Sequence, residues 1–243
     1  MSGDPPALMA VFAHPDDETF LCGGTLALLA RRGVRVQVLT ATPGQAGSRG
    51  DPPLCRPDEL AAMREQELRC ACAALGIEPP LLLDYPDGHL SEADPERIVA
   101  EILIVAREVR PQVMLTFGPE GVSGHPDHIA IGRFAAEAFH RAEDVVALYA
   151  RALPQTIAAM MGNPQIRPVP DESITLAVNV MPVWEAKLAA IRCHRTQLSG
   201  TPILSAPTDR QQMFLGREHF RRLAATGAGP CWREIQGLGD GNP

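Results

Sequence analysis

The chain has 243 residues, 45% of them hydrophobic and 21% charged, which is typical of a folded globular protein and excludes a mainly disordered one. With 22 basic and 29 acidic residues the net charge is −7, so a broad electrostatic surface for nucleic acid or anionic lipid is not expected. These values favour a small-molecule partner, with no nucleic acid and no membrane. No linker or repeat divides the chain, and we expect a single domain over residues 1–243.

The six cysteines are too few and too scattered for a disulfide scaffold, and no two of them have the Cys-x-x-Cys spacing of a structural zinc site. We expect free thiols in a reducing compartment. The N-terminal segment lacks the basic start of a signal peptide, and the apolar runs fall far short of the ~20 residues of a membrane span. The sequence therefore predicts a cytoplasmic protein. The cysteines are Cys22, Cys55, Cys70, Cys72, Cys193 and Cys231.

The first half of the chain alternates apolar runs with helical patterns. Residues 8–13 predict a buried strand, 18–32 a helix that stops at Gly33, and 34–40 a second strand. A long loop rich in Gly and Pro begins at residue 41, and its length favours a functional loop. The next helix begins near Asp58, a plausible N-cap, and ends at Gly76.

The same alternation continues through residue 139. Residues 81–84 predict a third strand, 95–110 an amphipathic helix with Pro95 at its start, and 113–117 a fourth strand. A second Gly-rich loop then leads into a helix that ends near Phe139. Residues 145–151 and 173–180 predict further strands and 181–197 a helix, while the pattern beyond Gly216 favours no element.

Four strand-loop-helix units predict an α/β protein with a Rossmann-like, three-layer fold and a mostly parallel sheet. Two clusters of imidazole and carboxylate follow predicted strands of this sheet, Ala-His-Pro-Asp-Asp-Glu at residues 13–18 and Gly-His-Pro-Asp-His at 124–128. Ligands of open α/β sheets bind at the C-terminal ends of the strands. Asp and Pro in such places also form plain turns and helix caps. Two clusters at equivalent strand ends favour a functional site there.

The residue types in these clusters suit a divalent metal ion. A catalytic zinc site uses about three protein ligands and keeps one position open. His14 and Asp17, three residues apart across the turn, can converge on one ion, and His128 can supply the third ligand. Two imidazoles and one carboxylate suit Zn²⁺, and the same set can hold Fe²⁺ or another divalent metal.

The remaining acidic and imidazole groups of the clusters suit acid–base chemistry. Asp16 stays free beside the predicted metal, where it can take a proton from bound water as a general base. His125 can hydrogen-bond or protonate the developing oxyanion or the leaving group. Asp127 is then expected to hold the ring of His125 and to raise its pKa.

The two clusters together resemble the PIG-L (LmbE-like) family, metal-dependent deacetylases with a Rossmann-like fold that act on N-acetylglucosamine-type amino sugars. Three further segments fit the resemblance: Met-Arg-Glu-Gln-Glu at 63–67 with Ala-Leu-Gly at 74–76, Tyr-Pro-Asp-Gly at 85–88, and residues 187–197. The resemblance implies that His14, Asp17 and His128 hold zinc, that Asp16 is the general base, and that His125 assists the tetrahedral intermediate.

The resemblance also implies two substrate contacts, Arg64 in the second helix and Asp87 in the Tyr-Pro-Asp-Gly segment. Arg64 can instead pair with Glu67 one turn along its helix, and Asp87 with Gly88 can form a plain turn. A homo-oligomer is also consistent with the family.

Two positions depart from the pattern of the family. Gln45 stands where many members have a glutamate in the loop after the second strand, and Ser123 stands where some members have a tyrosine. These departures weaken an assignment to one particular amino sugar.

The function that the sequence predicts is removal of an acetyl group from the amide of a soluble N-acetylglucosamine-type substrate, by attack of a metal-bound water. A metal-dependent esterase or phosphoesterase is an alternative, because the same ion and base can attack another electrophile. A second alternative is a non-catalytic sugar-binding protein that retains the metal site. Asp16 and His125 argue against it, since metal binding alone does not require them.

Overall fold

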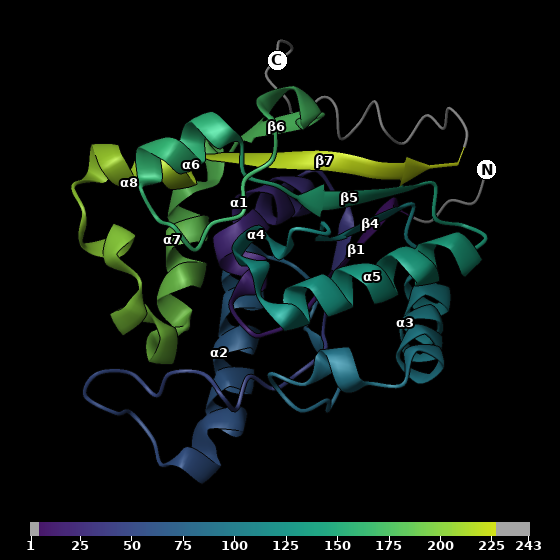
Figure 1. Ribbon diagram of the computed structural model, residues 1–243, viewed down its shortest axis with the longest axis horizontal. Coiled ribbons are helices and arrows are strands. Elements are labelled where there is room, and N and C mark those ends of the chain that lie inside the picture. The colour runs from purple at the N-terminus through teal and green to yellow at the C-terminus, as the bar shows by residue number, and fades with distance from the viewer. Residues whose placement is uncertain (1–4, 227–243) are drawn as a thin grey trace.

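The computed structural model describes residues 5–226 and contains a seven-stranded sheet (Figure 1). The strand order is β3-β2-β1-β4-β5-β7-β6. Neighbouring strands from β3 to β5 pair in parallel, whereas β7 is antiparallel to both β5 and β6. The predicted mostly parallel sheet is therefore confirmed. The strands are β1 (Ala7–Phe12), β2 (Arg35–Thr40), β3 (Leu81–Leu82), β4 (Val113–Phe117), β5 (Ala147–Arg151), β6 (Leu176–Asn179) and β7 (Arg217–Ala225).

Helices cover both faces of the sheet, which makes the predicted three layers. Figure 1 shows α1, α2 and α7 to the left of β1 and β4, with α5 in front of these strands and α3 to the right. Helix α3 packs against α5, while α1, α2 and α7 pack against one another. The α-helices are α1 (Asp17–Arg31), α2 (Leu60–Leu75), α3 (Pro95–Val109), α4 (Gly121–Gly124), α5 (Pro126–Arg141), α6 (Gln155–Met161), α7 (Trp184–Cys193) and α8 (Thr208–Leu215). Within residues 5–226, no helix has the length and apolarity that crossing a membrane requires.

The centre of the sheet is apolar on both faces. Every residue of β1 and every residue of β4 is buried, as expected for parallel strands that carry helices on both sides. Strand β1 pairs with β4 in the register Leu8 to Val113 and Ala10 to Leu115. The chain turns outward in opposite directions after these two strands, so their C-terminal ends flank a crevice where such sheets bind ligands.

The C-terminal part of the sheet differs most from the prediction. Strand β7 lies where the sequence favoured no element, and it inserts between β5 and β6. The helix predicted over 181–197 is shorter, because α7 ends at Cys193 and a 3₁₀ segment, Arg195–Gly200, follows. His194 leaves helical geometry at φ −80° and ψ 55°, and its ring points into the protein interior.

The cysteines also require a correction. Cys70 on α2 and Cys193 at the end of α7 form a disulfide, with their Cα atoms 5.7 Å apart. Cys22, Cys55 and Cys72 are free, and Cys231 lies outside the described residues. The pairing joins residues 123 positions apart and depends on the packing of α2 against α7, which spacing does not reveal. The cysteines therefore give no support for a reducing compartment.

Candidate active site

A pocket at the C-terminal edge of β1 and β4 gathers the predicted site residues. The loop after β1 supplies His14, Asp16 and Asp17, and the start of α5 supplies the second cluster. Parallel strand pairing explains why these distant segments meet, since both strands end at the same edge. The predicted residues that line the pocket are His14, Asp16, Asp17, Arg64, Asp87, His125 and His128. Asp127, the eighth, lies below it in contact with His14.

Three donor atoms converge in this pocket. The Nδ1 atom of His14 lies 3.3 Å from Nε2 of His128. Asp17 lies between the two rings, with one carboxylate oxygen 3.3 Å from His128 Nε2 and the other 3.7 Å from His14 Nδ1. Four-coordinate zinc with ligands at about 2.0–2.1 Å implies ligand-to-ligand separations of about 3.3 Å. The two imidazole nitrogens and the Asp17 oxygen that faces His128 are separated by this distance, whereas the Asp17 oxygen that faces His14 is 3.7 Å from Nδ1.

The far side of each ring shows which nitrogen is free to bind a cation. His14 Nε2 lies 3.0 Å from Asp87 Oδ1 and 3.3 Å from Asp127 Oδ2, and both of these atoms can only accept from it when ionised. His128 Nδ1 lies 3.0 Å from the carbonyl oxygen of Gly121 and must donate to it. In the neutral form of each ring, these contacts place the proton on His14 Nε2 and on His128 Nδ1, which leaves a lone pair on each of the two facing nitrogens. Carboxylates or carbonyls behind a histidine are the usual support of a metal ligand.

Two other groups of side chains have donor atoms close together, His14 with His125 and His128, and His14 with Asp87 and Asp127. Asp87 and Asp127 face the nitrogen of His14 that donates to them, and they also accept backbone N–H groups of other residues. They therefore support His14 from behind. His125 places a donor atom within 4.8 Å of donor atoms of both His14 and His128, so it is a further candidate ligand beside Asp17.

The ionisable groups of the pocket shift one another's pKa values. Burial opposes the charged form of His14, but hydrogen bonds with Asp127 and Asp87 outweigh it and raise the pKa to about 10. Burial opposes ionisation of Asp17, but the imidazoles of His128 and His14 outweigh it and lower the pKa to about 2. The carboxylate of Asp17 is thus anionic at neutral pH. This carboxylate can therefore accept hydrogen bonds or bind a cation.

The second cluster differs from the prediction in one respect. Asp127, fully buried, directs its carboxylate to His14 and to the backbone N–H groups of Gly88 and Leu90, at 2.7 and 3.0 Å. His125 instead accepts the backbone N–H of Asp127 at Nδ1, 3.2 Å away, as the N-cap of α5. Burial and the neighbouring imidazoles lower the pKa of His125, opposite to the direction expected from Asp127 alone. The sequence did not show which imidazole this carboxylate faces.

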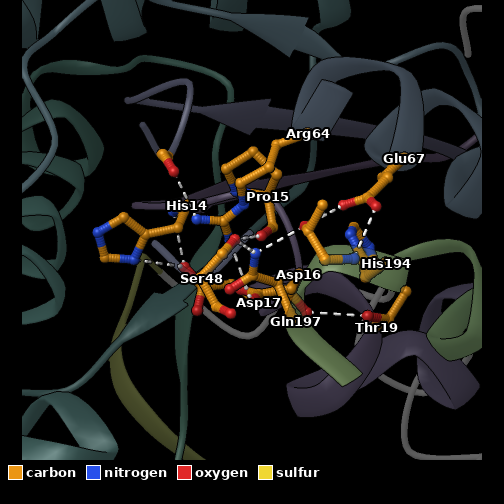
Figure 2. Close-up of polar contacts among 12 residues, drawn as sticks. His14, Pro15, Asp16, Asp17, Thr19, Ser48, Arg64, Glu67, His194 and Gln197 are labelled. Carbon is orange, nitrogen blue, oxygen red and sulfur yellow. Dashed lines mark hydrogen bonds and ion pairs between the residues drawn. The ribbon is translucent and has the colours of Figure 1, made fainter. Parts of the chain in front are cut away.

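Asp16 stands beside the donor cluster in an unusual backbone conformation. Its φ of 118° lies in the left-handed region that L residues rarely adopt, and such strain is found mainly at functional sites. Its side chain is 23% exposed and accepts a hydrogen bond from Arg64 at 3.1 Å (Figure 2). Burial raises the pKa of Asp16 to about 6, against the opposing effect of Arg64.

Arg64 is held deep in the pocket wall. It donates to the carbonyl oxygen of Gly44 at 2.8 Å and also to that of Pro15, as well as to Asp16. Its predicted alternative partner, Glu67, instead accepts the N–H and hydroxyl of Thr196, at 2.8 and 2.6 Å. A Cβ at Gly44 would meet the Arg64 guanidinium, and the φ of +72° also favours glycine at this position.

Sequence reasoning missed a buried pair behind Asp16. Glu18 and His194 are both fully buried, and Glu18 Oε1 lies 2.6 Å from His194 Nε2. Figure 2 shows His14 on one side of Asp16 and His194 on the other. His194 belongs to the segment 187–197 that contributed to the family resemblance, but its partner lies 176 positions away in the chain.

Comparison with known proteins agrees with this geometry. A family model described as GlcNAc-PI de-N-acetylase (PIG-L) matches residues 9–139. The 1D-myo-inositol 2-acetamido-2-deoxy-α-D-glucopyranoside deacetylase of Acidothermus cellulolyticus is 32% identical, over 90% of this chain and 89% of that protein. The probable N-acetyl-α-D-glucosaminyl L-malate deacetylase 2 of Bacillus cereus is 34% identical, over 78% of this chain and 83% of that protein.

The fold also matches a solved structure. The crystal structure of a conserved protein from Thermus thermophilus superposes with a TM-score of 0.69 at 25% identity, and the match covers 92% of this chain and 97% of that one. The range matched by the family model includes both motifs, residues 13–18 and 124–128. This chain belongs to the PIG-L (GlcNAc-PI de-N-acetylase) family.

Proposed function

We propose that this protein is a metal-dependent deacetylase that hydrolyses the acetamide of a small N-acetylglucosamine-type substrate. The observation that carries the proposal is the convergence of His14 Nδ1, His128 Nε2 and the Asp17 carboxylate beside the partly exposed carboxylate of Asp16. The family relatives supply the substrate class, since their names specify deacetylation of N-acetylglucosaminyl compounds.

His14, Asp17 and His128 are the proposed metal ligands. Two neutral imidazoles and one carboxylate favour Zn²⁺, and Fe²⁺ suits the same donors. A bound divalent cation supplies Lewis acidity, which polarises the acetyl carbonyl and acidifies water. Asp87 and Asp127 fix the tautomer and the orientation of His14 through its Nε2 atom.

Asp16 is the proposed general base. Its carboxylate takes a proton from the attacking water as the oxygen bonds to the acetyl carbon. The same proton then passes to the amine nitrogen as the carbon–nitrogen bond breaks, which yields acetate and a free amine. Arg64 holds one oxygen of the carboxylate at 3.1 Å and so fixes the direction of the other.

His125 is the proposed donor to the developing oxyanion. Because its Nδ1 accepts the N–H of Asp127, the neutral ring carries its proton on Nε2. The lowered pKa keeps the ring neutral at pH 7, so it acts by hydrogen bonding rather than as a full charge. Asp127 contributes indirectly, because its carboxylate supports His14 and its backbone N–H donates to Nδ1 of His125.

Arg64 and Asp87 both line the pocket, and we retain them as proposed substrate contacts. Each also has a structural bond, Arg64 to Asp16 and Asp87 to His14. No feature of the described pocket favours phosphoester cleavage or a non-catalytic role.

Replacing Asp16 by Asn tests the assignment of the base. Asp16→Asn keeps the size and the polarity of the side chain but cannot take up the proton, so kcat should fall by roughly 10²–10⁴-fold. Zinc content, measured by metal analysis of the purified protein, should stay at the parental level. The assay is release of free amine from an N-acetylglucosaminyl glycoside.

Asp209→Asn, on the exposed first turn of α8, is the matched control and should keep parental kcat. Parental kcat in zinc-loaded Asp16→Asn protein would show that another group is the base.

Metal binding should release protons and strengthen with pH. The pKa of His14 is about 10, so at pH 7 its ring carries a proton that a cation at Nδ1 must displace. Asp17 also raises the pKa of His128, so we expect release of at least about one proton per Zn²⁺ and an affinity that falls at least about tenfold for each unit by which the pH falls below 10. Calorimetric titration in two buffers of different ionisation enthalpy measures the release.

His89→Gln alters an exposed histidine outside the donor cluster and should release the same number of protons. Zinc binding with no proton release, and with an affinity that does not change between pH 6 and 9, would contradict the assignment of His14 as a ligand.

A further inference from the structure

A second depression adjoins the pocket of the proposed metal ligands, and the two share the side chain of His125. A substrate whose acetamide reaches His125 can extend directly into this depression. Its lining contains no acidic side chain. The lining residues are Ser123, Gly124, His125, Pro164, Gln165 and Arg167.

The backbone of Arg167 is fixed at this depression from two directions. Its N–H donates to the carbonyl oxygen of Val122 at 2.6 Å. Two residues on, Val169 donates to Leu153 and accepts from Gln155, at 2.9 and 3.0 Å, which anchors the segment beside α6. These hydrogen bonds fix the segment that carries Arg167 as one side of the depression.

The loop on the other side is strained where it meets Arg167. Val122 has φ 61° and ψ −50°, a conformation that is unfavourable for a β-branched residue. Gly124 has φ +74°, and a Cβ there would lie 3.1 Å from Nε of Arg167. The strained turn thus presents its carbonyl to Arg167, and the glycine leaves room for the arginine side chain beside His125. Persistent strain of this kind is characteristic of functional sites.

The guanidinium of Arg167 is available for a ligand. Within residues 5–226 it forms no ion pair and no side-chain hydrogen bond, and the residue is exposed. The nearby acidic side chains have other partners, since Glu120 pairs with Arg221 at 2.9 Å and Asp171 accepts from Thr156. A planar guanidinium with free N–H groups matches a carboxylate or phosphate in two-point geometry.

We propose that this depression binds the group attached to the acetylated sugar, that this group is anionic, and that Arg167 recognises it. The inference rests on the proposed deacetylase function and names the substrate class within it. It favours a glycoside that carries a carboxylate or a phosphate over one that carries a neutral polyol.

The test compares two substrates of similar size, N-acetylglucosaminyl L-malate and N-acetylglucosaminyl-myo-inositol, with the methyl glycoside as a third. The parental protein should have a kcat/KM for the malate compound at least about tenfold above that for the inositol compound. Arg167→Gln should raise KM for the malate compound about tenfold or more, and should raise it much less for the neutral compounds. Arg167→Lys, which keeps the charge, should fall between the two.

Arg107→Gln removes an exposed arginine of α3, outside the site, and should leave all three substrates unaffected. Equal losses on anionic and neutral substrates in Arg167→Gln, or a parental preference for the inositol compound, would overturn the role of Arg167 and leave the deacetylase function standing. Absence of turnover on all three substrates by zinc-loaded protein would overturn both.

A different observation, the buried pair behind Asp16, carries a second inference. Glu18 accepts the backbone N–H of Asp16 at 3.0 Å with one carboxylate oxygen and pairs with His194 through the other. The position of His194 is also fixed, because Thr196, two residues later in the chain, donates hydrogen bonds to Glu67 of α2. Contacts that involve α2 and the segment after α7 thus stabilise the left-handed backbone conformation of Asp16.

We infer that His194 is a positioning residue that holds Asp16 through Glu18. His194→Leu removes the imidazole partner of Glu18, so kcat should fall by about ten- to a hundredfold while KM and zinc content stay near parental values. His194→Gln can still donate to Glu18 and should recover most of kcat. Both variants are assayed well below their melting temperatures.

Two results would overturn this inference. One is a folded His194→Leu protein with parental kcat, and the other is His194→Gln as impaired as His194→Leu. If His194→Leu does not fold, kcat of His194→Gln is compared with kcat of Glu18→Gln. Only Glu18→Gln weakens the contact with the Asp16 N–H, so it should have the lower kcat. Equal kcat values in the two variants would overturn the inference.

Discussion

The parallel pairing of β1 with β4 is the constraint on which the site depends. It brings the turns that follow Phe12 and Phe117 to one edge of the sheet, although 105 residues separate Thr116 from Val11, its hydrogen-bond partner on β1. Phe117 then stacks on His128, with ring centroids 4.0 Å apart and planes 10° apart. The same buried strand therefore positions the second cluster and orients one of its rings.

The two ring nitrogens of His14 face different groups at this edge of the sheet. One nitrogen faces Asp87 and Asp127, and the other faces His128 and Asp17. In the proposed site, the two carboxylates behind the ring neutralise charge in a buried place, and the Asp17 carboxylate in front of it binds the cation. Arg64 and Glu18 restrain Asp16 from outside the donor cluster, which suits the acid–base role proposed for it.

Local spacing predicted the parts of the site that lie within one turn or at matching strand ends. His14 and Asp17 are three residues apart, and His128 follows an equivalent strand, so their convergence follows from the fold class. The contacts of Asp127 with His14 and of His194 with Glu18 depend on how helices from distant parts of the chain pack, which no periodicity shows. The disulfide between Cys70 and Cys193 and the insertion of β7 between β5 and β6 were hidden for the same reason.

Anomalous X-ray diffraction from crystals of the zinc-loaded protein, recorded on both sides of the zinc absorption edge, tests the central claim most directly. The account predicts one strong anomalous peak bounded by His14 Nδ1, His128 Nε2 and the Asp17 carboxylate, with Asp16 beside it and not bonded to it. A peak among His14 Nε2, Asp87 and Asp127, or among His14, His125 and His128 with Asp17 turned away, would contradict the assignment of ligands and base.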